Sequence, residues 1–136
     1  FSYRKTWELT MKKIFWILLL MIVPGISLAA DNASRIAETY QCDMKEGKTM
    51  EEIQAVNVRW LANARKQAGT DSVNSYAFEP IVGDQTKFVF IDSYPDLAAW
   101  AAAKSADQTE EGKAIEAAFA DLMDCEKNRL YKSTKH

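Results

Sequence analysis

Histidine is almost absent from this chain of 136 residues, since its one histidine is the terminal His136. A Ser/His/Asp or Cys/His set needs an imidazole beside its nucleophile, so the sequence argues against nucleophilic catalysis of these kinds. Two cysteines without an internal histidine do not complete the four ligands of a zinc site. We therefore expect no metal site.

Glycine is also scarce, and basic residues do not outnumber acidic ones. None of the five glycines lies in a glycine-rich phosphate loop, and we expect no cofactor. The chain has 17 Lys and Arg residues against 19 Asp and Glu residues, a net charge of −2. Nucleic acids and anionic membrane surfaces require a concentrated basic footprint. The charge balance thus argues against both as partners.

The chain has one long apolar run, and it follows the first methionine. Lys12 and Lys13 precede an apolar stretch at positions 14–23, and Pro24-Gly25 and small residues come next. This order is typical of a secretory signal peptide, which we place at residues 11–30, with cleavage after Ala29 or, as second choice, Ala30. An uncleaved membrane anchor is the alternative. A spanning helix needs roughly 18 or more apolar residues, and this apolar run is shorter and is interrupted by Pro24-Gly25.

These features predict a periplasmic or secreted protein without a stable membrane anchor after cleavage. Residues 1–10, "FSYRKTWELT", precede the only plausible initiating methionine, and we interpret them as translated upstream sequence. The remaining residues 31–136 are enough for a single α+β domain with a modest core and too few for two.

Cys42 and Cys125 lie near the two ends of this domain. In an exported protein an even number of cysteines indicates disulfide pairing. A redox-active pair would favour the C-x-x-C spacing, which the chain lacks. A structural disulfide that closes so long a loop stabilises a fold by roughly 3 to 5 kcal/mol on the chain-entropy model.

Alternation and capping residues predict the first half of the domain. A strand is expected at 37–44 because apolar and polar residues alternate there. Thr49 and Glu52 form the pattern of a capping box, which starts a helix that should run to about residue 66 and stop before Gly69. A second strand is expected within 74–83, with Tyr76 and Phe78 on one face and Pro80 indicating a sheet edge.

The second half continues with a strand at 87–94 that forms a hairpin with the preceding one. Ser93 is the expected cap of the next helix, with Pro95 in its first turn. This alanine-rich helical region should break near residues 105–107 and restart with Thr109 as a cap. A short final strand is expected at 125–131.

The order strand, helix, strand, strand, helix, strand predicts a ferredoxin-like βαββαβ sandwich. Its four-stranded sheet is antiparallel, with the helices on one face. The first and last strands are neighbours in this arrangement, which brings Cys42 and Cys125 together. The disulfide expected from the cellular compartment therefore agrees with the predicted topology.

The segment "FVFIDSYPDLAAWAAAK" resembles the strand and helix junction of the dimeric α/β-barrel superfamily, which includes antibiotic-biosynthesis-monooxygenase-like and NIPSNAP-like domains. The resemblance implies a homodimer in which two sheets pair face to face, with a ligand pocket between each sheet and its own helices. Haem-degrading relatives need an axial histidine, and this domain has no internal histidine, which argues against that activity.

Asn57 lies within the apolar stripe of the first predicted helix. A buried amide without partners costs on the order of 1 to 3 kcal/mol, so it either bonds to a backbone group or water, or contributes to a pocket. Some monooxygenases of the superfamily place an Asn and a Trp of the first helix in their pocket, and the resemblance implies this role for Asn57 and Trp60. The alternative for Trp60 is a structural role, in which its large apolar side chain is buried in the core.

Four more residues are candidates for the same pocket, and each also has an ordinary structural interpretation: Tyr76, Asp92, Tyr94 and Trp100. The leading functional hypothesis is an exported binding or stress-related domain that holds a small apolar or aromatic ligand. A cofactor-independent monooxygenase acting on a small aromatic substrate is the second hypothesis, and a structural or assembly protein is the third. The sequence does not decide whether the protein is an enzyme.

Overall fold

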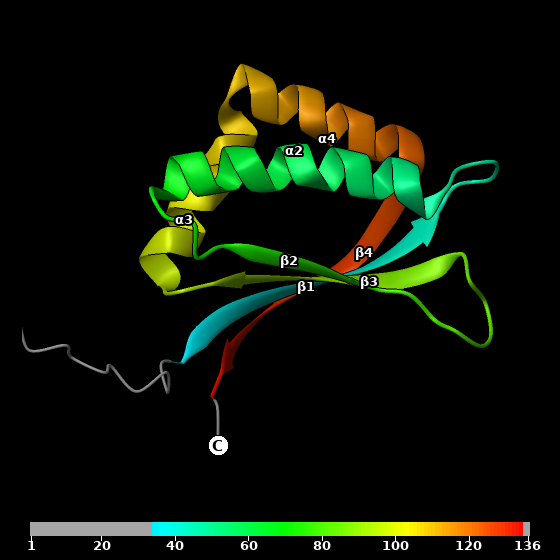
Figure 1. Ribbon diagram of the computed structural model, residues 1–136, viewed down its shortest axis with the longest axis horizontal. Coiled ribbons are helices and arrows are strands. Elements are labelled where there is room, and N and C mark those ends of the chain that lie inside the picture. The colour runs from blue at the N-terminus through cyan, green and yellow to red at the C-terminus, as the bar shows by residue number, and fades with distance from the viewer. Residues whose placement is uncertain (1–33, 135–136) are drawn as a thin grey trace, which may run out of the picture. The chain divides into compact units, whose positions relative to one another are not determined.

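The computed structural model of the protein describes residues 34–134. The predicted signal peptide and upstream segment lie outside the described residues. Figure 1 shows the order of the elements, which are β1 (Arg35–Met44), α2 (Met50–Ala68), β2 (Asn74–Phe78), β3 (Lys87–Tyr94), α3 (Leu97–Ser105), the short 3-10 helix η2 (Ala106–Gln108), α4 (Glu110–Leu122) and β4 (Met123–Ser133).

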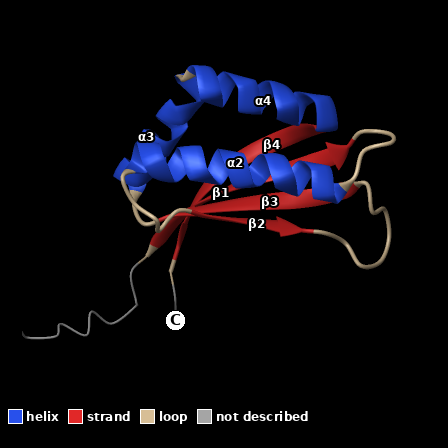
Figure 2. Cartoon of the chain, turned by 45° about the horizontal axis from the view of Figure 1, so that its top comes forward, coloured by secondary structure: helices blue, strands red, loops and turns tan. Residues whose placement is uncertain are grey.

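The four strands form one antiparallel sheet in the order β2-β3-β1-β4. Figure 2 shows the helices together on one side of this sheet, with its other face left open. The predicted ferredoxin-like α+β architecture is thus confirmed. The two central strands carry a consistent inward face, because alternate residues of β3 are buried while those between them are partly exposed.

Helix α2 has the predicted start. The Thr49 side chain accepts a hydrogen bond from the backbone N–H of Glu52, and the Glu52 carboxylate accepts one from the backbone N–H of Thr49 at 2.9 Å. The helix ends at Gly69, whose φ of 65° is left-handed and whose N–H donates to the carbonyl of Arg65. The predicted end near residue 66 is short by two residues.

The prediction for the start of α3 is wrong. Ser93 belongs to β3, where its hydroxyl accepts a hydrogen bond from Nε of Arg35 at 2.7 Å. Asp96 caps the helix instead, accepting from the N–H of Ala99 at 2.8 Å, and Pro95 lies before the cap. Sheet pairing of Ser93 with β1 and β2 extends the strand past the point where local sequence suggested a helix.

Two strand boundaries also differ from the predictions. Strand β2 ends at Phe78 and does not include Pro80, which has no N–H to donate to the ladder. Strand β4 begins directly after α4 at Met123 and runs to Ser133, longer at both ends than the predicted strand. Its pairing with β1 is irregular between Thr39 and Gln41.

The core consists of two clusters between sheet and helices. One surrounds Ile53 and Phe90, and the other surrounds Ala64 and Ile115. Val56 and Phe119 pack against both clusters and join them. The apolar stripe predicted for the first helix therefore faces the sheet, and the buried residues of α4 do so as well.

Cys42 and Cys125 are direct neighbours in the pairing of β1 with β4. Their sulfur atoms lie 2.02 Å apart, at disulfide-bond distance, and their Cα atoms 4.0 Å apart. The Cys42 side chain is buried in the core, whereas Cys125 is exposed on the edge strand. The link connects positions 83 residues apart along the chain.

Between residues 34 and 134, no helix has the length and apolar character needed to cross a membrane.

Candidate functional site

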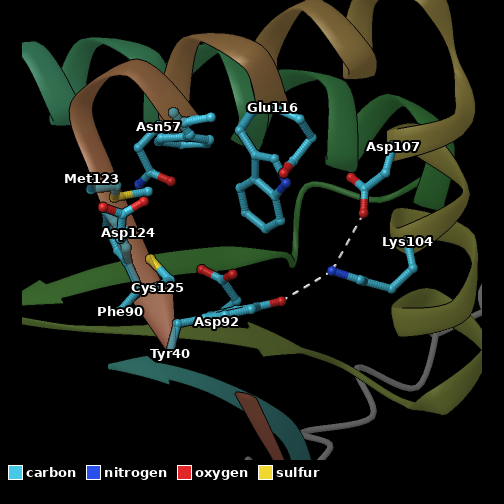
Figure 3. Close-up of a pocket in the computed structure, with 13 residues that line it drawn as sticks. Tyr40, Asn57, Phe90, Asp92, Lys104, Asp107, Glu116, Met123, Asp124 and Cys125 are labelled. Atoms are coloured by element: carbon cyan, nitrogen blue, oxygen red, sulfur yellow. Dashed lines mark hydrogen bonds and ion pairs between the residues drawn. The ribbon is translucent and has the colours of Figure 1, made fainter. Parts of the chain in front are cut away.

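A cavity of about 360 Å³ lies between the sheet and the helices α2 and α4. Figure 3 shows side chains from the strands and from the helices pointing toward it. Its rim includes Glu116 and Ala120 of α4 and Asp124 of β4, which are exposed. The complete lining comprises Tyr40, Asn57, Trp60, Phe90, Asp92, Lys104, Asp107, Glu116, Phe119, Ala120, Met123, Asp124 and Cys125.

Asp92 lies at the floor of this cavity. The alternation of β3 turns it toward the helices between Phe90 and Tyr94, and only 5% of its surface is exposed. Its Oδ1 accepts a hydrogen bond from the hydroxyl of Ser75 on β2 at 2.6 Å. Burial raises the pKa of Asp92 to about 7, against the lowering effect of Ser75. A carboxyl group with this pKa exchanges protons near neutral pH.

Asn57 connects α2 to this carboxyl group through Ser75. Its Nδ2 donates to the Ser75 hydroxyl at 3.1 Å, while that hydroxyl in turn donates to Asp92. This arrangement explains why an amide lies in the apolar stripe of α2: its side chain is hydrogen-bonded to Ser75 across the interface between helix and sheet. Asn57 also lines the cavity. It is therefore both a hydrogen-bonded amide at the interface between helix and sheet and a residue of the cavity lining.

A second carboxylate, Glu38, lies beside Asp92 in the register of β1 with β3 and is 2% exposed. Its Oε2 accepts from Nε1 of Trp100 at 3.0 Å, and its Oε1 accepts from Nδ2 of Asn128 at 2.6 Å. Both carboxylate oxygens thus have a donor. Trp100 acts here as a hydrogen-bond donor to a buried acid and does not line the cavity.

Among the described side chains, Lys104 is the one basic residue in the cavity lining. Its ammonium donates to the Tyr40 hydroxyl at 3.0 Å and lies 3.4 Å from Asp107 and 3.7 Å from Glu38. Figure 3 shows these contacts of Lys104 with Asp107 and Tyr40 on the side of the cavity nearest α3. Burial and the neighbouring Glu38 raise the pKa of Tyr40, so its phenol stays protonated.

The remaining carboxyl groups of the lining differ in their surroundings. Asp124 lies 3.4 Å from the ammonium of Lys45, outside the cavity. Partial burial and the nearby Asp107 raise the pKa of Glu116. Among residues 34–134 no three His, Cys, Asp or Glu side chains are grouped so that they could hold a metal ion.

The structure brings three of the six candidate pocket residues, Asn57, Trp60 and Asp92, to the cavity. Tyr76 is 52% exposed on the open face of the sheet, because its neighbour Ser75 takes the inward position opposite Asp92. Tyr94 is fully buried in the core, and its hydroxyl has no hydrogen-bond partner among the described residues.

Sequence reasoning missed Tyr40, Lys104 and Glu38 as parts of this region. A signal for Glu38 was present, because the period of two that placed Tyr40 and Cys42 on one face of the first strand also places Glu38 there. An acid on the inward face of a central strand requires buried partners. No comparable local pattern marked Lys104, which comes from the opposite layer.

The arrangement combines an apolar wall with a few convergent polar groups in a partly open cavity, which is a combination found in small-molecule sites. Asp92 can accept a proton or a hydrogen bond, and Asn57 can donate or accept one. These groups come from different layers of the fold, one from the sheet and one from α2.

No protein-family model and no curated protein matches the chain. Solved structures are similar to it in fold. SnoaB, a cofactor-independent oxygenase from Streptomyces nogalater, is 14% identical with a TM-score of 0.57, over 76% of this chain and 97% of that chain. A NIPSNAP family protein of unknown function from Agrobacterium tumefaciens is 16% identical with a TM-score of 0.56, over 74% and 89%.

A second NIPSNAP family protein from Agrobacterium tumefaciens is 19% identical with a TM-score of 0.55, over 74% of this chain and 86% of that chain. At these identities the similarity concerns the fold and carries no assignment of activity. The sheet order, the position of the helices and these similarities together show that the chain has a ferredoxin-like fold.

Proposed function

We propose that this protein binds a small ligand with an aromatic or apolar body in the cavity between its sheet and helices α2 and α4. The observation that carries the proposal is the cavity itself, whose volume of about 360 Å³ is within the range of small-molecule sites. Trp60, Phe90 and Phe119 supply an apolar wall, and Asn57 and Asp92 supply the polar groups that would orient a ligand.

A rim substitution tests this proposal without disturbing the core. Ala120 is exposed on α4 and lines the cavity, so Ala120→Phe should block entry. Ala117 is exposed on the same helix outside the lining, and Ala117→Phe is the matched control. Ligand-observed NMR with a panel of small aromatic fragments should show binding to the wild type and the control and loss in Ala120→Phe. Fragments that bind no variant, or all three equally, would contradict the proposal.

We also propose that the protein is exported and that it forms a homodimer. Disulfides persist in oxidising compartments, so the bonded distance between Cys42 and Cys125 supports a periplasmic or secreted location. The open sheet face exposes 52% of Tyr76 and 56% of Phe78, and such apolar exposure supports pairing with a second copy.

Sedimentation of two variants tests the homodimer. Phe78→Glu places a charge on the open sheet face, whereas Val58→Glu places one at a 68% exposed position of α2. The wild type and Val58→Glu should sediment as dimers and Phe78→Glu as a monomer. A wild type that stays monomeric at high concentration would contradict dimerisation.

Cofactor-independent oxygenation is the second candidate function. The similarity in fold to SnoaB and the position of Asn57, Trp60 and Asp92 around one cavity support it. A proton acceptor such as Asp92 would help to form the electron-rich anion that reacts with oxygen. Oxygen uptake with a hydroquinone-type substrate should then be lost in Asn57→Ala while the circular dichroism spectrum is retained. Equal turnover in both proteins would reject this assignment.

A further inference from the structure

The cavity lining has an excess of negative charge. Among the described side chains, the lining contains four carboxyl groups and one ammonium group, and these are Asp92 of β3, Asp107 of η2, Glu116 of α4, Asp124 of β4 and Lys104 of α3. Asp124 is exposed and has Lys45, outside the lining, as its partner, so the excess comes from the other three carboxyl groups. Carboxylates that face a partly enclosed space produce a negative potential there, because the low-dielectric walls focus the field. Such a potential attracts cations and repels anionic ligands.

The one ammonium group of the lining already has other partners. Lys104 lies within 4 Å of Asp107 and Glu38 and donates to Tyr40. Among the side chains that the structure describes, the ion pairs do not include Asp92. A buried carboxylate without a cationic partner costs the folded state free energy, since its lost hydration is not replaced.

Asp92 also retains an unused acceptor. Its Oδ1 is occupied by Ser75, whereas its Oδ2 has no hydrogen-bond partner among the described residues. This oxygen is not sealed in the core, because the Tyr94 hydroxyl is the only side-chain polar atom of the described residues that is both buried and unpartnered. Figure 3 shows the carboxyl group of Asp92 pointing from the sheet into the cavity beneath Asn57.

The cavity offers an aromatic wall next to this oxygen. Trp60 of α2, Phe90 of β3 and Phe119 of α4 all line it, and the rings of Phe90 and Phe119 pack edge to face at 6.4 Å. Aromatic surfaces favour both a stacked ring and a neighbouring cation. An apolar wall beside a free carboxylate oxygen matches a compact ligand with a ring at one end and a cation at the other.

We infer that the ligand of this cavity is a small aromatic amine, whose ammonium group donates to Oδ2 of Asp92 while its ring packs against Trp60 and Phe119. This inference rests on the proposed ligand-binding function and adds the chemical class of the ligand. Charge-assisted hydrogen bonds are about twice as strong as neutral ones, so the amine should contribute much of the affinity.

Three ligands that share one phenol ring test the inference with the full-length protein. Tyramine carries an amine, tyrosol an alcohol at the same position, and 4-hydroxyphenylacetate a carboxylate. Isothermal titration at pH 8 should show tyramine binding at least about tenfold more tightly than tyrosol, since a charged hydrogen bond is stronger than a neutral one. The carboxylate should bind most weakly because the lining repels it.

Two variants assign this preference to Asp92. Asp92→Asn should reduce the ratio of tyramine to tyrosol affinity to about one. Asp121→Asn removes an exposed carboxylate of α4 outside the lining and should leave the ratio unchanged. Ala120→Phe should weaken both ligands together.

The outcomes separate the two proposals. Tyrosol binding that is sensitive to Ala120→Phe, without any preference for tyramine, would overturn the amine inference and leave ligand binding intact. A preference for tyramine that survives in Asp92→Asn would also overturn the role of Asp92. If none of the three ligands binds, the amine inference fails, and failure of the broader fragment panel as well would remove the proposed function with it.

Discussion

Replacing Asp92 by asparagine should make the protein more stable at alkaline pH than the wild type. The asparagine side chain has nearly the same shape, and its Oδ1 can still accept the hydrogen bond from Ser75 that Asp92 accepts at 2.6 Å. The substitution therefore removes one ionisable group without removing its structural contact. Any change in the pH dependence of unfolding then reports the cost of ionising Asp92 in the folded protein.

The magnitude follows from the pKa of Asp92, which burial raises from 3.8 to about 7. Each pKa unit corresponds to about 1.4 kcal/mol, so the complete shift corresponds to about 4 kcal/mol. A raised pKa means that the folded protein holds a proton that the unfolded chain releases above pH 3.8. Stability is consequently lost as the pH rises from about 4 to about 7, and about 2 to 3 kcal/mol of this loss falls between pH 5 and pH 8.

Other groups face Asp92 and also respond to pH or charge: Glu38 and Tyr40 of β1, Ser75 of β2, Tyr94 of β3, Lys104 of α3 and Asp107 of η2. They are identical in the wild type and in Asp92→Asn. The difference in the free energy of unfolding between the two proteins therefore removes most of their contribution.

Urea unfolding followed by tryptophan fluorescence at pH 5 and pH 8 measures this difference. At each pH, the free energy of unfolding of the wild type is subtracted from that of Asp92→Asn. This difference should be about 2 to 3 kcal/mol larger at pH 8 than at pH 5. Asp121→Asn, which alters an exposed carboxylate, should follow the wild type at both pH values. A difference between wild type and Asp92→Asn that is the same at pH 5 and pH 8 would refute the reasoning.

Three further variants test the structure around the site. Replacing both Cys42 and Cys125 by alanine should lower the free energy of unfolding by about 4 to 5 kcal/mol, because the link spans 83 residues, and reduction of the wild type should give the same urea midpoint. Trp100→Phe removes a donor to the buried Glu38 and should cost about 1.5 to 3 kcal/mol in urea unfolding, and no loss would show that this hydrogen bond is unimportant. Gly112→Ala places a Cβ against the backbone of η2, so it should lower the melting temperature of the protein. Alanine normally stabilises a helix interior by about 1 kcal/mol relative to glycine, so a higher melting temperature would refute the close contact.

Local patterns were sufficient to predict most of the fold. The capping box of Thr49 and Glu52 and the left-handed Gly69 involve residues close in sequence, so their signal is complete within a few positions. The start of α3 was mispredicted because Ser93 and Asp96 are both good caps. Pairing of Ser93 with neighbouring strands decides between them, and that pairing is a property of the tertiary structure.

The site was less predictable for a related reason. Asn57 and Asp92 were identifiable, since each is a polar residue at an apolar position of its own helix or strand. Tyr76 was assigned to the wrong face because the pairing of Ser75 with Asp92 determines which side of β2 faces the helices. The larger apolar residues of the short β2 strand, Tyr76 and Phe78, lie on the open face of the sheet, while Ser75 and Ala77 face the helices, so alternation of apolar residues indicated the wrong face.

The two buried carboxyl groups of the sheet differ in how completely their oxygens are hydrogen-bonded. Glu38 and Asp92 are neighbours on adjacent strands, and both are almost completely buried. Trp100 and Asn128 satisfy both oxygens of Glu38, as a structural role requires. Asp92 receives one donor, Ser75, and its second oxygen faces a cavity. If packing alone determined this position, an apolar side chain would stabilise the fold more, whereas the proposed ligand would supply the second donor that Asp92 lacks among the described side chains.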